Sequence, residues 1–473
     1  MTLQRPLTFV FHDYETFGIH PGMDRPAQFA GIRTDQDLNP VGDPMMFYCR
    51  LPADYLPDPL SCMITGITPQ KANQSGMCEA EFIGRIHQEF SAPGSCIVGY
   101  NNIRFDDEFT RYTLYRNYYD PYAYSWQNGN SRWDLLDVVR ACYALRPEGV
   151  NWVFDDEGKP SFRLELLTQA NDIQHQNAHD ALSDVYATIG MAKVIRDAQP
   201  KLFSYLFELR NKNKVKALID VINMKPLVHV SGMFSAYQGC VSWVSPVAWH
   251  PVNQNAVIMV DLARDLSPLI ELTADELRER LYTRKDDLGE LLPVPVKLVH
   301  INKCPVLAPA ATLSEQRADE LGIDRSRCRI SLDQLRQHPE IREKLTQVFA
   351  TEREHDSSAS RDAELSLYEG FFNDNDKNTM ELVRKATPEQ LASTHFNFVD
   401  KRLSELLFRY RARNFPASLL PEEQRRWQQH CADYLMKRAD GYTLQLEQLY
   451  EQYANDNARL SIIKALAIYL QSL

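Results

Sequence analysis

The sequence contains no paired cysteine motif and no long hydrophobic run. Its 9 cysteines are odd in number, scattered along the chain and never spaced as CxxC. This argues against a disulfide framework and a structural zinc site, and favours isolated thiols in a reducing compartment. No stretch approaches the ~20 apolar residues of a membrane span, and residues 1–7 lack the apolar core of a signal peptide. We therefore expect a cytoplasmic protein without a membrane partner.

The chain also lacks an excess of basic residues. It carries 52 Lys and Arg against 63 Asp and Glu, a formal net charge of −11. Proteins that bind nucleic acids usually show a basic surplus, because they neutralise phosphates. Net charge does not exclude a local basic groove, however. A nucleic-acid enzyme with this composition must form its groove from clustered cations.

Length and pattern indicate about three domains, at ~150 residues each. Residues 1–199 alternate short apolar runs with helical spacing, which predicts an α/β layer with a mixed sheet. Expected strands lie near residues 8–11, 29–34, 44–49 and 95–100, and an amphipathic helix covers 78–90.

The rest of the chain has a different pattern of apolar residues. A helical passage over 202–221 precedes β-rich runs at 227–230, 241–244, 256–260 and 296–301, so we expect a small β-containing domain over 200–351. The polar stretch 353–361 is the best linker candidate, and 352–473 is expected to be a helical domain. Its predicted helices cover 379–384, 401–413, 421–437 and 444–473, with no repeat of fixed period.

Two carboxylates follow the first apolar run. Asp13 and Glu15 are separated by one residue after Thr8-Phe9-Val10-Phe11, so in a strand they point to the same face. Two carboxylates at the end of a buried strand are costly unless a cation neutralises them. Oxygen ligands of this kind suit Mg²⁺ or Mn²⁺. By itself, however, the pair is also explained as an exposed acidic pair.

A second acidic segment follows the strand predicted near residue 97. Asn101 and Asn102 favour a turn, after which Asp106, Asp107 and Glu108 begin a helix. We expect Asp106 to face the core and Asp107 to face water. The simpler explanation is that the acids favour the positive end of the helix dipole.

A third segment combines a histidine with an aspartate. Asn177 can cap a helix that carries Ala181, Val185 and Ile189, which places Asp184 toward the sheet. His179 then lies before or within the first turn. Taken alone, His179 is better explained as a solvated histidine than as a catalyst.

Together the segments follow the order Asp-x-Glu, Asp, His-x4-Asp, which resembles the DEDD exonucleases of the RNase H-like fold. Further stretches resemble the bacterial exodeoxyribonuclease I family along essentially the whole chain: residues 11–18, 99–102, 131–134, 140–149, 229–234 and 411–416. The resemblance implies an RNase H-like exonuclease domain, an SH3-like domain and a helical C-terminal domain that encircle a strand.

The resemblance also implies an activity. Members of the family hydrolyse single-stranded DNA processively from the 3′ end and release 5′-mononucleotides, in DNA repair and recombination. Asp13, Glu15, Asp106 and Asp184 would be the carboxylates for two Mg²⁺ ions, with Mn²⁺ as a substitute, and His179 would be the general base. The family implies a monomer.

Single-strand grooves combine cations for phosphates with aromatic rings for bases. Residues 111–146 interleave both types, although an aromatic core with a solvated basic face has the same pattern. With the resemblance, the candidate DNA-binding residues are Arg111, Tyr122, Trp126, Arg140, Arg163, Lys212, Asn255, Lys297, His300 and Asn302. Members of the family also bind the acidic, Phe-ending tail of single-stranded DNA-binding protein, and the candidates for that surface are Arg146, Tyr205, Lys225, Arg325 and Arg336.

Three alternatives remain at this point. An RNA or oligoribonucleotide exonuclease is possible, because no residue pattern identifies contacts to the 2′-OH. Two others are a proofreading subunit and a non-catalytic single-strand binder with a decayed nuclease site. The extra ~270 residues, which could hold a DNA strand, argue against an RNA exonuclease and a proofreading subunit, because neither needs such domains. The presence of all five catalytic residue types argues against decay.

Overall fold

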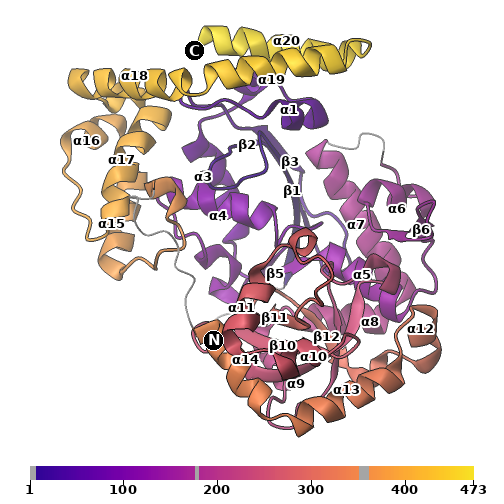
Figure 1. Ribbon diagram of the computed structural model, residues 1–473. Coiled ribbons are helices and arrows are strands. Elements are labelled where there is room, and N and C mark those ends of the chain that lie inside the picture. Colours follow the sequence, from indigo (N-terminus) through magenta and orange to yellow (C-terminus); the bar gives the residue numbers. More distant parts are fainter. Residues whose placement is uncertain (1–6, 176–179, 351–361) are drawn as a thin grey trace, which may run out of the picture. The chain divides into compact units, whose positions relative to one another are not determined.

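The computed structural model describes residues 7–175, 180–350 and 362–473 (Figure 1). The chain divides into two compact units. The first comprises Met1–Ser131, His175–Thr188 and Ser357–Leu473, and the second comprises Arg132–Gln174 and Ile189–Asp356. The boundaries fall within strand β5 (Ser131–Asp134) and within helix α7 (Ala181–Ala198).

A mixed sheet with the strand order β3-β2-β1-β4-β5 contains the N-terminal strands. Strand β1 (Thr8–Thr16) pairs antiparallel with β2 (Pro26–Thr34) and parallel with β4 (Ser95–Gly99). Strand β3 (Met45–Tyr48) adds to β2. The predicted strands and the mixed character of the sheet are confirmed.

Strand β1 extends five residues beyond the apolar run that predicted it, because β2 pairs with it along almost its whole length. Its other neighbour is shorter, since β4 pairs only with Thr8–Phe11. Asp13 and Glu15 therefore sit opposite Ala30 and Gln28 of β2 but beyond the paired part of β4. This unequal pairing leaves room beside the two carboxylates for side chains from elsewhere.

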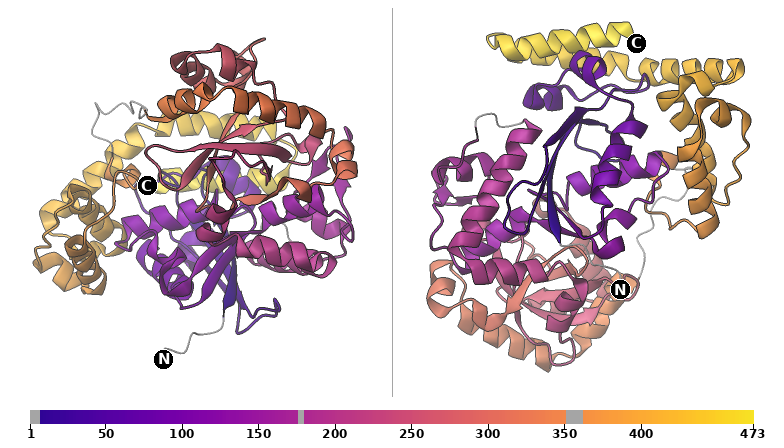
Figure 2. Two further views of the ribbon diagram at one scale, coloured as in Figure 1. Left: turned by 90° about the horizontal axis from the view of Figure 1, so that it is seen from below. Right: turned by 180° about the vertical axis from the view of Figure 1, so that it is seen from behind.

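Helices α3 (Glu79–Phe90) and α4 (Asp106–Arg116) cover one face of the sheet (Figure 2). Apolar side chains from α3, including Phe82, Ile86 and Phe90, pack against Val10 and Phe29 of the sheet. The helical spacing predicted over 78–90 is thus confirmed. Two shorter helices of this unit are α1 (Pro59–Thr65) and α2 (Pro69–Ser75).

The C-terminal part of the first unit is helical, as expected. Its helices are α15 (Asp374–Lys385), α16 (Pro388–Ser393), α17 (Lys401–Asn414), α18 (Pro421–Met436), α19 (Ala439–Gln452) and α20 (Asn457–Ser472). The prediction of continuous helix over 444–473 is wrong, because Asp456 starts a new helix by accepting a hydrogen bond from the backbone N–H of Arg459 (3.0 Å). The linker predicted at 353–361 lies outside the described residues.

The second unit contains an antiparallel sheet with the order β11-β10-β9-β8-β12. Its strands are β8 (Leu227–Val230), β9 (Val241–Trp249), β10 (Ala256–Asp261), β11 (Val296–His300) and β12 (Val306–Pro309). The first four were predicted. Strand β12 was not predicted, because Pro305 precedes it and Pro309 is its last residue. Prolines are tolerated there because β12 is an edge strand.

Helices and a hairpin complete this unit. The passage predicted as one helix over 202–221 is two helices, separated where Asn211 caps the second one. The elements are α5 (Leu135–Leu145), β6 (Val153–Phe154), β7 (Pro160–Ser161), α6 (Leu164–Ala170), α8 (Pro200–Glu208), α9 (Lys212–Leu218), α10 (Ser267–Glu271), α11 (Ala274–Tyr282), α12 (Glu315–Glu320), α13 (Arg325–Gln337) and α14 (Glu340–Ala350).

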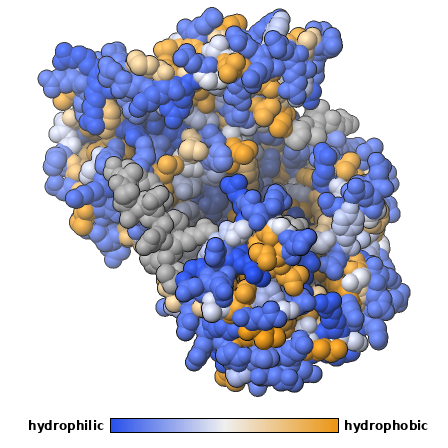
Figure 3. All heavy atoms as spheres, viewed as in Figure 1, coloured by the Kyte–Doolittle hydropathy of each residue, from blue (hydrophilic) through white to orange (hydrophobic). Residues whose placement is uncertain are grey.

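Hydrophilic side chains predominate on the face drawn in Figure 3, with hydrophobic ones in small patches. Among the described residues, no helix is both long enough and apolar enough to span a bilayer.

A buried ion-pair network joins the N-terminal and C-terminal segments of the first unit. Glu364 is 6% exposed and binds Arg25 (2.8 Å) and Arg413, while Arg413 also binds Asp54 (2.6 Å). The neighbouring arginines hold the pKa of both Asp54 and Glu364 below its usual range, although burial opposes that shift. Removal of one partner from such a network leaves uncompensated buried charge.

We expect Glu364→Gln to lower the free energy of unfolding at pH 7 by about 3 kcal/mol. Because the folded-state pKa of Glu364 is depressed, its contribution is complete above the unfolded value of ~4.5 and is lost as the pH falls below it. Urea denaturation should therefore show the gap between wild type and variant shrinking from pH 7 toward pH 3. The exposed pair of Glu381 with Lys385 provides the control, and Glu381→Gln should change little. A constant gap at all pH values would contradict the assignment.

Candidate active site

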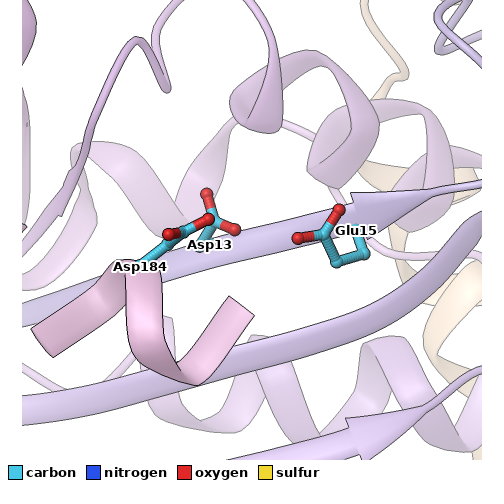
Figure 4. Close-up of side chains that lie close together, drawn as sticks. All are labelled: Asp13, Glu15 and Asp184. Atoms are coloured by element: carbon cyan, nitrogen blue, oxygen red, sulfur yellow. The ribbon is translucent and has the colours of Figure 1, made fainter. Parts of the chain in front are cut away.

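Three carboxylates converge beside the part of β1 that extends beyond its pairing with β4 (Figure 4). Asp13 and Glu15 come from β1 and Asp184 comes from α7, and one oxygen of each lies within 4.8 Å of the others. Figure 4 shows the two strand residues on the same side of β1, facing the first turns of the helix. The i, i+2 spacing therefore has the effect that the sequence predicted.

The helix that carries Asp184 is fixed locally. The backbone N–H of Asp184 donates to the carbonyl of Asp180 (3.0 Å), and the Thr188 hydroxyl donates back to the carbonyl of Asp184 (2.8 Å). Ala181, Val185 and Ile189 are buried on the apolar side of α7, as the spacing predicted. Asp184 is consequently held on the first turn of the helix, where it meets β1.

Asp106 approaches the same strand from the start of α4. The chain turns sharply after β4, with Asn101 in the left-handed region (φ 70°), which asparagine tolerates better than most residues. Asp106 is 3% exposed, and its Oδ1 accepts a hydrogen bond from the backbone N–H of Tyr14 (3.1 Å). It therefore lies against the residue between Asp13 and Glu15, although it is outside the 4.8 Å group.

These carboxylates repel one another in a poorly solvated environment. Burial raises the pKa of Asp13 well above its usual value, and Asp106, Glu15 and Asp184 raise it further. Burial raises the pKa of Glu15 to about 8, with contributions from Asp184, Asp106 and Asp180. A donor set made only of carboxylate oxygens, crowded enough to resist ionisation, fits a hard divalent cation.

One expectation about this site is wrong and another falls outside the described residues. Asp107 was expected to face water, but it is 1% exposed. Helix α4 is covered on most sides, so its consecutive first residues are both enclosed. The predicted general base, His179, lies outside the described residues.

The sequence analysis missed His175. Its Nε2 lies 2.5 Å from Oδ1 of Asp184, and its side chain is only 5% exposed. The contact orients the Asp184 carboxylate toward β1. In the sequence, His175 is visible only as a second histidine, nine residues before Asp184. The order of the motifs does not distinguish such a histidine from an ordinary loop residue.

The candidate DNA-binding residues of the first unit lie on α4 and in the segment that follows it. Arg111 is 8% exposed, pairs with Glu108 (2.8 Å) and lies over the Tyr122 ring at 5.5 Å. Trp126 is 63% exposed. The exposed Trp126 ring suits base stacking, whereas the guanidinium of Arg111 is already paired with Glu108.

In the second unit the candidates form separate groups. Arg140 and Arg163 line one hollow. Asn255, His300 and Asn302 gather at one end of the β10–β11 pair, where the carbonyl of Asn255 accepts from the N–H of Ile301 (2.8 Å). Lys297 is three residues from His300 on β11, so it points to the other face and donates to the Ser231 hydroxyl (2.7 Å). Lys212 is exposed at the start of α9.

The candidate partner-binding residues form two pairs and one outlier. Arg146 donates to the carbonyl of Thr312 (3.1 Å), and the Tyr205 hydroxyl donates to that of Leu307 (2.8 Å), so both lie against one segment. Arg336 donates to the carbonyl of Asn223 (3.1 Å), close in sequence to the exposed Lys225. Arg325 lies over the Trp243 ring at 5.3 Å.

Comparison with known proteins assigns each part of the chain to a domain family. The family described as Exonuclease matches residues 10–191, the Exonuclease I SH3-like domain matches 210–351, and the Exonuclease I C-terminal domain matches 361–473. With the mixed sheet and its carboxylate cluster, these matches define a nuclease with an RNase H-like exonuclease domain, an SH3-like domain and a helical C-terminal domain.

Relatives that align along almost the whole chain identify the family within this class of nuclease. The exodeoxyribonuclease I of Escherichia coli is 58% identical over 467 residues, and that of Haemophilus influenzae is 53% identical over 467; each alignment covers 98% of both chains. The chain belongs to the exodeoxyribonuclease I family. The structure of E. coli exonuclease I in complex with a dA16 oligonucleotide matches with a TM-score of 0.97 at 57% identity, covering 98% of this chain and 99% of that one. A zinc ion-bound form of the E. coli complex with single-stranded DNA matches with a TM-score of 0.96 at 57% identity, covering 99% of both chains.

We expect a divalent cation to stabilise this fold by relieving the repulsion among Asp13, Glu15 and Asp184. Addition of Mg²⁺ or Mn²⁺ after chelation should raise the Tm of wild type, because the cation binds only the folded carboxylate cluster. In Asp13→Asn the chelated protein should be at least as stable as wild type, while the cation-dependent shift should be largely lost. The control is Asp197→Asn, which removes an exposed carboxylate from the same helix as Asp184. An unchanged shift in the Asp13 variant would contradict the proposed metal site.

Proposed function

We propose that this protein is a Mg²⁺-dependent 3′→5′ exonuclease that hydrolyses single-stranded DNA processively to 5′-mononucleotides. The observation that carries the proposal is the convergence of Asp13, Glu15 and Asp184 within 4.8 Å, with Asp106 bonded to the strand between the first two. Family membership supports the reaction class, and relatives solved with single-stranded oligonucleotides support the substrate.

The chain's residues divide the work at the scissile phosphate. Asp13, Glu15, Asp106 and Asp184 would hold the cations, and His175 would orient Asp184 through its 2.5 Å contact. Bound divalent cations supply a lower pKa for the attacking water and stabilise charge on the leaving oxygen. His179 would accept the proton of that water near neutral pH, since an unperturbed histidine has a pKa of ~6.5.

The remaining candidate residues would hold the strand. Exposed cationic side chains such as Lys212 would meet phosphates, and exposed rings such as Trp126 would stack on bases. We propose the division 1–199, 200–351 and 352–473 for the three domains. We also propose that Arg146, Tyr205, Lys225, Arg325 and Arg336 bind the acidic tail of single-stranded DNA-binding protein, that the protein acts as a cytoplasmic monomer, and that it serves DNA repair and recombination.

The site is tested with Asp13→Asn and Asp184→Asn on an oligonucleotide labelled at its 5′ end. Both variants should lose more than about a hundredfold in rate with Mg²⁺, because even groups that only support metal ligands contribute ten- to a hundredfold. Gel analysis of the digestion products measures the rate. Asp197→Asn, on the same helix, should digest at the wild-type rate. Wild-type rates in either active-site variant would reject the assignment.

Substrate choice is tested separately with matched single-stranded DNA, duplex DNA and RNA, each blocked at one end. The proposal predicts rapid digestion of single-stranded DNA with a free 3′ end and little digestion of the others. Equal rates on RNA would instead support an oligoribonucleotide exonuclease, and strong binding without digestion of any substrate would support the non-catalytic alternative.

A further inference from the structure

Helix α4 carries Asp106 on its first turn but begins without a side-chain cap. Its N-cap residue is Phe105, whose side chain makes no capping hydrogen bond. The preceding loop contributes a backbone contact, since the N–H of Asp107 donates to the carbonyl of Asn102 (2.9 Å). Because no side-chain cap fixes the first turn, contacts with other elements must place it relative to β1.

Tyr14 of β1 contacts this helix at two points. Its backbone N–H donates to Oδ1 of Asp106 (3.1 Å), and its side-chain hydroxyl accepts a hydrogen bond from the hydroxyl of Thr110 (3.0 Å). Asp106 and Thr110 are four residues apart, so they lie on the same face of α4. One strand residue therefore holds two successive turns of the helix that brings Asp106 to the site.

The side chain of Tyr14 lies on the opposite side of β1 from Asp13 and Glu15, because successive strand residues alternate. It is 4% exposed, and its ring packs against Phe29 at a centroid distance of 5.1 Å and an interplanar angle of 69°. The Phe82 ring of α3 lies 6.3 Å away in the same apolar cluster. The core of the unit consequently fixes the position of the tyrosine hydroxyl.

Thr110 is enclosed as completely as its partner. It is 1% exposed, and β-branching limits its side chain to few rotamers on a helix. A threonine in a helix can donate to the carbonyl four residues earlier, which here is that of Asp106. The hydroxyl of Thr110 instead donates to Tyr14, so it joins the helix to the strand.

We propose that Tyr14 and Thr110 are positioning residues, whose hydroxyl pair aligns Asp106 with the other carboxylates and so sets the affinity of the cluster for divalent cations. The inference rests on the proposed function, in which Asp106 is a cation ligand. It gives a role in the reaction to two hydroxyl groups behind the strand that carries the first two carboxylates. Removal of a group that orients a metal ligand typically costs ten- to a hundredfold in metal affinity or activity.

The decisive variant is Thr110→Val, which keeps the shape of the side chain and removes its hydroxyl. Isothermal titration calorimetry of Mn²⁺ into the chelator-treated, DNA-free protein gives the Kd for the cation. Thr110→Val should raise this Kd about tenfold. On an oligonucleotide labelled at its 5′ end, the Mg²⁺ concentration for half-maximal rate should rise by a similar factor. The KM for DNA at saturating Mg²⁺ should stay at the wild-type value.

Two further substitutions separate the hydrogen bond from packing. Thr110→Ser restores the hydroxyl and should return the Kd for Mn²⁺ close to the wild-type value. Tyr14→Phe should weaken Mn²⁺ binding as Thr110→Val does, and the double variant should bind no more weakly than either single one, because both remove the same interaction. A serine variant that binds as poorly as the valine variant, or effects that add in the double variant, would overturn the proposal.

Thr113→Val is the matched control on the same helix. Thr113 is 0% exposed, and its hydroxyl accepts a hydrogen bond from the guanidinium of Arg116 (3.2 Å), which pairs with Glu79 of α3. This variant should lower the Tm much as Thr110→Val does and keep the wild-type Kd for Mn²⁺. Equal weakening of Mn²⁺ binding in both variants would mean a general destabilisation of α4, and the inference would fail.

The outcomes also distinguish this inference from the proposed function. If wild type binds Mn²⁺ and digests single-stranded DNA while Thr110→Val matches it in both, the inference fails and the function stands. If wild type neither binds a divalent cation nor digests single-stranded DNA, the proposed function itself is wrong.

Discussion

The mutual repulsion of carboxylates beside β1 is the constraint around which the first unit is built. Each acid is held by a separate element: Asp13 and Glu15 by pairing of β1 with β2, Asp106 by the N–H of Tyr14, and Asp184 by α7 and His175. Without such support the charges would separate, since burial raises the cost of every ionised oxygen. The sheet therefore preorganises a set of carboxylates that is unfavourable by itself and that bound cations would stabilise.

Net charge proves a poor guide to partners in this chain. The surplus of acids is partly accounted for by the carboxylates that cluster beside β1. Many cations are also committed internally, as the pairing of Arg111 with Glu108 shows. A surface that binds a single strand therefore needs cations that are not already paired with carboxylates, beside accessible aromatic rings.

The predictable features of the site were those that depend on local periodicity. Asp13 and Glu15 share a face because strands alternate, and Asp184 faces the sheet because its helix has one apolar side. The orientation of Asp107 was not predictable, since it depends on how completely other segments enclose α4. His175 was equally hidden, because its contact with Asp184 is set by the path of a loop. Strand β12 depends on its position at the edge of the sheet, and the helix breaks before Asn211 and Asp456 depend on N-caps. The local sequence signals for these features are too weak to predict them.

The C-terminal helices are more than an appended module. Tyr115 and Tyr118, at the end of α4 and just beyond it, are fully buried among Leu367, Met380 and Leu403 of the C-terminal segment. The hydroxyl of Tyr118 donates to the carbonyl of Leu403 (2.6 Å), and the Glu364 network adds ion pairs to this contact. The same helix α4 begins with Asp106. The helix that brings Asp106 against β1 is therefore anchored at its other end by the C-terminal helices, so residues far from β1 in the sequence support the geometry of the carboxylate cluster.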